Sequence, residues 1–286
     1  MRFLLMIAAA VLLLGCIAVP AETPAPDQSS APAGPAQEET PAAEPGATAP
    51  EETPPAEPAP AQTTTLKNEE ISYASGPWKI YGTLYESKAD TAKRVVVLVP
   101  MLGQARDSYP IRFIEALHDG LPDALILAID PRGHGKSTNA GTWQSFDMLA
   151  FKDMKTDILR VKSLLQPDYP SLNEVHVVGA SIGSTSAINA GAQDKTITKV
   201  VMLSPGMEYR DVDITSALED YIHPVLAAAS SGDSYSVQSI SDIESLASRP
   251  ELEKKIYSGS AHGTDMFAAT EGSSDSLENV IIEFLK

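Results

Sequence analysis

The residues most informative about chemistry surround Ser181. An apolar run, Val175–Val178, leads into residues 179–183 (Gly-Ala-Ser-Ile-Gly), which fit the pattern Gly-x-Ser-x-Gly, and a helical stretch follows. A serine on such a tight turn from strand to helix exposes its hydroxyl above the sheet, and the helix N-terminus favours developing negative charge. The pattern predicts Ser181 as a nucleophile. The simpler alternative is a glycine-rich turn without chemistry.

A serine hydroxyl is a weak nucleophile until a base takes its proton. His262 is the best candidate for this base because it follows the last apolar run, before a closing helix, and so is expected at the carboxyl edge of the sheet. The alternative is a loop histidine without a role. The other histidines, which fit strands, helix ends or turns better, are His118, His134, His176 and His223.

The base in turn needs a carboxylate that fixes its tautomer. Asp233 follows the preceding apolar run, and it completes the chain order Ser, Asp, His. An Asp after Gly is also a common turn residue. The rival carboxylates are Asp211, Asp213 and Asp265.

These three residues need a scaffold, and the sequence predicts a mostly parallel sheet covered by helices on both faces. Short β-rich runs, most of them largely apolar, indicate six buried parallel strands: Val95–Val99, Leu125–Ile129, Val175–Val178, Lys199–Leu203, Val225–Ala228 and Lys254–Ser258. Alternating residues around Ile71–Ala74 and Trp78–Tyr85 predict an antiparallel hairpin at a sheet edge. Helical patterns cover Tyr109–His118, Phe146–Leu165, Ile182–Ala192, Ile214–Ile222, Ser236–Ser248 and Ser276–Leu285. The short connection from Pro205 to Pro224 leaves no room for a large lid domain.

Residues 71–286 resemble the α/β-hydrolase superfamily, and in particular its small, lidless esterases and dienelactone-hydrolase-like members. The local matches are the turn at Ser181, the run Asp-Pro-Arg-Gly-His-Gly from Asp130, and His-Gly-Thr from His262. The resemblance implies an α/β-hydrolase fold and serine-dependent hydrolysis of an acyl substrate, without a metal or an organic cofactor.

One departure from the superfamily concerns the oxyanion hole. Where the superfamily usually has His-Gly after the first parallel strand, this chain has residues 100–103, Pro-Met-Leu-Gly. Backbone N–H groups from this loop and from the residue after the nucleophile form the oxyanion hole in the superfamily. Ile182 and either Leu102 or Met101 are therefore expected to supply them. Further side chains could line an acyl pocket or simply pack: Trp143, Phe146 and Met148.

The N-terminal residues predict export. Met1–Cys16 contain one basic residue and an apolar run too short to be a permanent membrane span. The end of this segment, Leu13-Leu14-Gly15-Cys16, resembles the lipobox of bacterial lipoproteins, so residues 1–16 are expected to be a signal peptide and Cys16 a lipid anchor in a membrane outside the cytoplasm. An ordinary signal peptide or an uncleaved anchor is the alternative. Cys16 is the only cysteine, so no internal disulfide can form.

Residues 17–66 differ sharply in composition from the rest. They hold 12 of the 22 prolines and eight acidic residues, with no Lys or Arg, which is typical of a semi-extended tether. Residues 67–286 are expected to form one domain. These residues carry a formal charge of −10 without a cluster of Lys and Arg, which excludes nucleic acid as a plausible partner.

Three functions remain compatible with the sequence. The first is an acyl hydrolase that uses Ser181, His262 and Asp233. The second is a surface binding protein on an inactive hydrolase scaffold, and the third is an envelope acyltransferase, which shares the acyl-enzyme but uses another acceptor. The identity of the acyl substrate and the oligomeric state are not encoded in any recognisable pattern.

Overall fold

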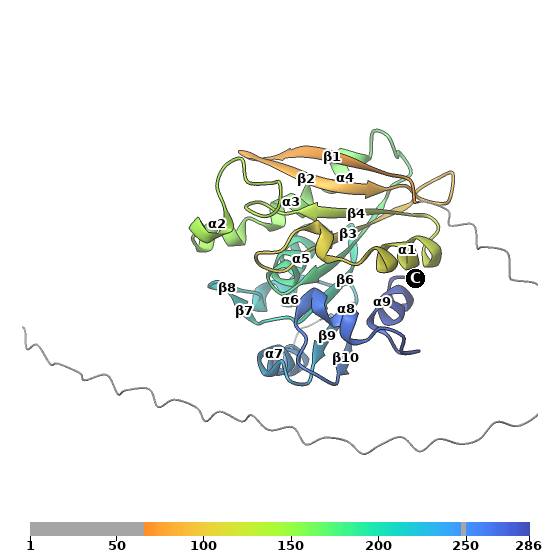
Figure 1. Cartoon of the computed structure of the whole chain (residues 1–286). Coiled ribbons are helices and arrows are strands. Elements are labelled where there is room, and N and C mark those ends of the chain that lie inside the picture. Colours follow the sequence, from red (N-terminus) through yellow and green to blue (C-terminus); the bar gives the residue numbers. More distant parts are fainter. Residues whose placement is uncertain (1–65, 247–249) are drawn as a thin grey trace, which may run out of the picture. The chain divides into compact units, whose positions relative to one another are not determined.

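The computed structural model of the chain describes residues 66–246 and 250–286 (Figure 1). Its contacts divide the chain into two units, Met1–Pro60 and Ala61–Lys286, and every described element belongs to the second. The expected signal peptide (1–16), Cys16 and nearly all of the expected tether (17–66) lie outside the described residues.

The described part contains one eight-stranded sheet, in the order β1-β2-β4-β3-β5-β6-β9-β10. Its strands are β1 Asn68–Ser75, β2 Trp78–Tyr85, β3 Arg94–Val99, β4 Ala124–Asp130, β5 Glu174–Ala180, β6 Ile197–Leu203, β9 Val225–Ser230 and β10 Leu252–Tyr257. The β1–β2 hairpin joins the sheet antiparallel to β4, and the other strands run parallel to one another. The six predicted parallel strands and the antiparallel hairpin at the edge are confirmed. The prediction that all six are buried is wrong for β10, which is an edge strand with none of its residues buried.

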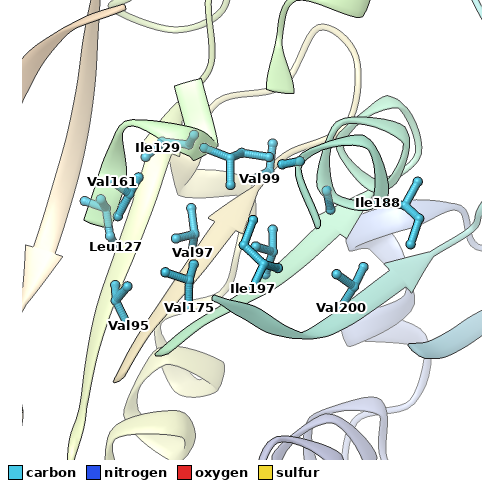
Figure 2. Packing of buried hydrophobic residues seen from close by; sticks show 14 of the residues in the cluster. Val95, Val97, Val99, Leu127, Ile129, Val161, Val175, Ile188, Ile197 and Val200 are labelled. Carbon is cyan, nitrogen blue, oxygen red and sulfur yellow. The ribbon is translucent and has the colours of Figure 1, made fainter. Parts of the chain in front are cut away.

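Helices cover both faces because each central strand is apolar on both sides. In β3, the side chains of Val95, Val97 and Val99 face a cluster shared with the helices that follow residue 155, as Figure 2 shows for part of this cluster. Val96 and Leu98 face the opposite cluster, which includes the first and last helices of the domain.

The helices agree with the predictions in most places. They are α1 Ile111–Gly120, α2 Met148–Lys152, α3 Lys155–Leu159, α4 Val161–Leu165, α5 Ile182–Gln193, α6 Thr215–Asp220, α7 Ser234–Ser245, α8 Met266–Ala269 and α9 Leu277–Leu285. Short 3₁₀ turns, which were not predicted, occur at Arg106–Ser108, Trp143–Ser145 and Gly263–Asp265. Among the described residues, none of the helices has both the length and the apolar content to cross a membrane.

The helical pattern predicted over residues 146–165 is divided in the structure into three short helices, α2, α3 and α4. Tight turns separate α2 from α3, with Met154 N bonded to Phe151 O at 3.2 Å and Asp157 N bonded to Met154 O at 3.1 Å. Bonds of this i to i+3 type place every third residue on one side. Phe151, Met154 and Asp157 are accordingly all buried. The Asp157 carboxylate accepts hydrogen bonds from the backbone N–H of Arg132 at 2.9 Å and from its guanidinium at 2.8 Å.

The connection between β6 and β9 is short, as predicted. Within residues 204–224, all of which the structure describes, a hairpin of β7 (Glu208–Tyr209) and β8 (Val212–Asp213) is followed by α6. No large lid domain lies in this segment. The hairpin turns through Arg210 and Asp211, whose φ angles of 54° and 64° are those of a type I′ turn.

His176 is a titratable side chain buried in the middle of the sheet, in β5. It is 1% exposed, and its Nδ1 has no hydrogen-bond partner among the described residues. Burial, together with the nearby positive charges of Arg94 and Lys199, lowers its pKa from 6.5 to about 3. Glu174, whose carboxylate lies 3.5 Å from His176 Nε2, is too exposed to offset this.

We expect this histidine to make the stability of the domain fall below pH 6.5. The unfolded chain binds a proton at His176 near pH 6.5, whereas the folded chain excludes it down to about pH 3. The free energy of unfolding should lose up to about 1.4 kcal/mol per pH unit in this window. Denaturant unfolding of the wild type and of His176→Gln at several pH values checks this, with His223→Gln, at a partly exposed site, as the control. Equal pH slopes in wild type and His176→Gln would contradict the prediction.

Candidate active site

Ser181 occupies the turn between β5 and α5 in a strained backbone conformation, with φ 52° and ψ −117°. The flanking glycines are needed because a Cβ at Gly179 would lie 2.3 Å from the Gly183 carbonyl oxygen, and a Cβ at Gly183 would lie 2.5 Å from the carbonyl oxygen of Val99. The Gly-x-Ser-x-Gly pattern therefore lets this turn pack directly on the end of β3. Ser181 is 8% exposed.

The loop after β3 lies beside the start of α5. Ile182 is the first residue of α5, so its backbone N–H has no partner within the helix. Leu102 is partly buried and packs in the same apolar cluster as Ile182. The side chain of Met101 instead reaches the loop of His262, where a Cβ on Gly263 would lie 2.8 Å from the Met101 sulfur.

Asp233 and His262 meet at the carboxyl ends of β9 and β10. His262 Nδ1 lies 2.7 Å from an Asp233 carboxylate oxygen, with the Asp233 side chain 12% exposed and the His262 side chain 38% exposed. Asp233 is also the N-cap residue of α7, and its other oxygen accepts the Ser236 N–H at 3.4 Å.

Backbone hydrogen bonds hold the two loops together. Ser231 N donates to Tyr257 O and Gly232 N donates to Gly259 O, each at 2.7 Å. The loop of Asp233 thus continues the β9–β10 pairing beyond the sheet, and this brings side chains 29 residues apart into contact.

Two opposing effects act on the Asp233 carboxyl. Burial raises its pKa, but hydrogen bonding from Ser236 and His262 lowers it by more, so the pKa lies below the ordinary value for an aspartate. Asp233 is therefore ionised at neutral pH, when it can accept the Nδ1 proton of His262 and leave Nε2 free as a base.

Tyr209, in β7, is a further residue at this site that was not predicted from the sequence. Its hydroxyl donates to the carbonyl oxygen of Ser204 at 3.0 Å, and its ring packs against the cluster that contains Ile182. Burial raises the pKa of Tyr209, the nearby hydroxyls of Ser236 and Ser181 lower it, and Asp233 raises it further. Tyr209 therefore stands beside both Ser181 and Asp233. No pattern in the sequence marks this residue, because its two-residue strand exists only through pairing with β8.

The aromatic residues proposed for the acyl pocket differ in placement. Phe146 is partly buried and contacts Phe151 edge to face, with ring centroids 5.3 Å apart. Trp143 lies against the loop after β3, where a Cβ on Gly103 would be 3.4 Å from its ring. Met148 is 44% exposed on α2.

Arg210, in the turn of the β7–β8 hairpin, lies close to two of these aromatic side chains, Trp143 and Phe151. The Arg210 guanidinium lies 5.9 Å from the ring centroid of Trp143 and 5.7 Å from that of Phe151. The exposed Arg210 of the hairpin therefore lies over the rings of both Trp143 and Phe151.

The other histidines lie elsewhere. His134 is 2% exposed, and its Nδ1 lies 2.9 Å from the Arg132 carbonyl oxygen in the turn after β4. Burial lowers the pKa of His134, so it is neutral and part of this turn. His118 lies near Asp119, and His223 lies near the carbonyl oxygen of Lys195.

The rival carboxylates are not paired with His262. Asp211 is exposed in the hairpin turn, and Asp265 is exposed in the 3₁₀ turn after His262. Asp213 accepts the Thr215 N–H at 2.9 Å. Within residues 66–246 and 250–286, no group of three or more His, Cys, Asp or Glu side chains is arranged to hold a metal ion.

Comparisons with known proteins agree with this architecture. Residues 90–264 match the family described as serine aminopeptidase, S33 (Hydrolase_4). No curated protein matches the chain. The chain is similar in structure to a dienelactone hydrolase from Anabaena variabilis, with a TM-score of 0.60, 20% identity, and coverage of 77% of this chain and 97% of that one. It is also similar to an esterase from Pyrococcus furiosus, with a TM-score of 0.62, 18% identity, and coverage of 77% and 92%.

A further similar structure is acetyl xylan esterase 1 from Thermoanaerobacterium, with a TM-score of 0.58, 12% identity, and coverage of 79% of this chain and 85% of that one. At these identities the structural matches establish the fold alone. The family match spans more than half of the chain, from β3 to the 3₁₀ turn after His262. The chain therefore belongs to the serine aminopeptidase S33 family of serine hydrolases and has the α/β-hydrolase fold.

Proposed function

We propose that this protein hydrolyses carboxylic esters or related acyl bonds through Ser181, His262 and Asp233. The observation that carries the proposal is the 2.7 Å contact between His262 Nδ1 and Asp233, at the same sheet edge as the strained Ser181. A histidine held by an ionised carboxylate has the tautomer that accepts a serine proton. The strained serine conformation is typical of functional sites.

The reaction would proceed in two halves. Ser181 Oγ bonds to the substrate carbonyl carbon while its proton passes to His262 Nε2, and the oxyanion binds the N–H groups of Ile182 and of Leu102 or Met101. Collapse of this intermediate breaks the bond to the leaving alcohol, which takes the proton from His262. Water then attacks the acyl-enzyme in the same way and releases the acid.

Ester cleavage is favoured over peptide cleavage by the structural neighbours, which include two esterases. Peptide cleavage is the second candidate because the matching family is described as serine aminopeptidase. The short β6–β9 connection supports an open cleft, which suits modest acyl groups and also polymer-attached substrates.

A fluorophosphonate probe combined with a substrate panel tests the proposal. The full chain is expected to react once with the probe, at Ser181 as located by peptide mass spectrometry, and to hydrolyse short p-nitrophenyl esters. Faster turnover of aminoacyl p-nitroanilides would select the aminopeptidase activity. Ester formation with added alcohols in excess of hydrolysis would select an acyltransferase. A chain that neither reacts nor turns over any of these substrates would be the binding protein on an inactive scaffold.

We further propose that the enzyme works outside the cytoplasm, attached to a membrane through lipid on Cys16 and separated from it by the tether of residues 17–66. The lipobox-like run before Cys16 supports this. Two acyl chains or more are needed for stable anchoring. In a host that processes lipoproteins, Cys16→Ser is expected to move the protein from the membrane fraction to the soluble fraction and to abolish palmitate labelling. Unchanged membrane attachment would contradict the anchor.

A further inference from the structure

Ser204, the residue directly after β6, has an unusual backbone. Its φ is 48°, and it is one of four residues other than glycine with positive φ in the described part of the chain. Two of the others form the β7–β8 turn, and the remaining one is Ser181. Ser204 is also 0% exposed. A side chain in this conformation is costly and persists only where surrounding contacts require it.

The backbone of Ser204 is held from two sides. Its N–H donates to Ala228 O in β9 at 2.7 Å, and its carbonyl oxygen accepts the Tyr209 hydroxyl at 3.0 Å. Leu203, the preceding residue, accepts the N–H of Ser181 at 2.8 Å. The end of β6 is therefore bonded to the turn of Ser181 on one side and to β9, the strand that precedes Asp233, on the other.

The side chain of Ser204 reaches the third part of the site. Its Oγ accepts the backbone N–H of Gly263, next to His262, at 2.9 Å. The hydroxyl is 3.6 Å from the Met266 sulfur and is close enough to Asp233 to help lower the pKa of that carboxyl. One buried hydroxyl thus contacts the loop that carries His262 and lies near the Asp233 carboxyl.

We propose that Ser204 is a positioning residue that fixes the His262 loop relative to Asp233 and Ser181. The Gly263 N–H has its acceptor only if Ser204 keeps its strained conformation, and the Tyr209 hydroxyl secures that conformation. The inference deepens the proposed hydrolase function and rests on it. It gives a reason why serine occupies a position where glycine would be free of strain.

Two substitutions separate this role from a contribution to stability alone. Ser204→Ala removes the hydroxyl and keeps the strain, whereas Ser204→Gly removes the hydroxyl and relieves the strain. Both variants are expected to lower kcat by about 10- to 100-fold, the range for an unsatisfied buried hydrogen-bonding group, with KM changed less than about two-fold. The reaction rate with the fluorophosphonate should fall by a similar factor.

A matched control is Ser239→Ala in α7. Ser239 is 1% exposed, and its Oγ also accepts a backbone N–H, that of Met207 at 3.1 Å, but it does not contact the His262 loop. This variant should keep the kcat of the wild type. Ser204→Gly is expected to melt at or above the temperature of Ser204→Ala, because it relieves the strain. If it nevertheless keeps the wild-type kcat, the positioning role is overturned.

A second readout does not depend on turnover. The His262 Nδ1 proton bonded to Asp233 should give a downfield proton NMR signal, which His262→Gln identifies by its loss. In Ser204→Ala and Ser204→Gly this signal should broaden or disappear through faster exchange with water. A wild type without activity toward the probe or any substrate would refute the proposed function, whereas an unchanged downfield signal in both variants would refute the role of Ser204.

Discussion

Replacing Ser181 with alanine is expected to lower kcat on any accepted ester by about 10⁴- to 10⁶-fold and to abolish labelling by the fluorophosphonate. Alanine lacks the hydroxyl whose oxygen would attack the carbonyl carbon, so no acyl-enzyme can form. The fold should persist, because alanine removes a single atom and the backbone hydrogen bond from Ser181 N to Leu203 O remains. Steady-state kinetics and intact-protein mass spectrometry measure the two effects.

Ser186→Ala provides the comparison for this variant. Ser186 is also buried in α5, and its hydroxyl donates to the Ile182 carbonyl oxygen within the helix at 3.1 Å. Its loss should leave both kcat and labelling near wild-type values. If Ser181→Ala retains more than a hundredth of the wild-type turnover, or if the probe still labels it at one site, another residue is the nucleophile.

Asp233→Asn should be the second most severe substitution, with a fall in kcat of about 10⁴-fold. An amide at this position can donate to His262 Nδ1, which places the ring proton on Nε2 and removes the lone pair that would accept the Ser181 proton. The N-cap of α7 should survive, because asparagine caps helices as well as aspartate does. Activity measured together with thermal unfolding distinguishes the tautomer effect from loss of structure.

The rival carboxylates supply the controls for Asp233. Asp211→Asn keeps a residue that tolerates the positive φ of 64° in the hairpin turn, and Asp265→Asn changes an exposed side chain close to His262 in sequence. Each should retain kcat within a few-fold of wild type. A larger loss in either variant than in Asp233→Asn would show that the acid was assigned to the wrong loop.

The strand predictions held because each central strand is recognisable from its own residues. Runs such as Val95–Val99 and Leu125–Ile129 are apolar without interruption, as burial on both faces requires. The division of residues 146–165 into three helices could not be predicted, for the opposite reason. The hydrophobic pattern of this segment is compatible with one helix, but the tight turn that buries Asp157 depends on Arg132, a residue far away in the sequence.

By itself, the sequence determined the fold class, the turn at Ser181 and the loops in which Asp233 and His262 lie. The spacing of the glycines and the succession of strands along the chain can be seen directly in the sequence. The carboxyl ends of parallel strands meet at one edge of the sheet in any fold of this class, so the loops that follow the strands are expected to lie near one another. Only the tertiary structure decided that Asp233 contacts His262, that Ser204 accepts the N–H next to His262, and that Tyr209 donates to the Ser204 backbone. These contacts depend on how neighbouring strands align and on backbone angles such as that of Ser204, which no short sequence pattern encodes.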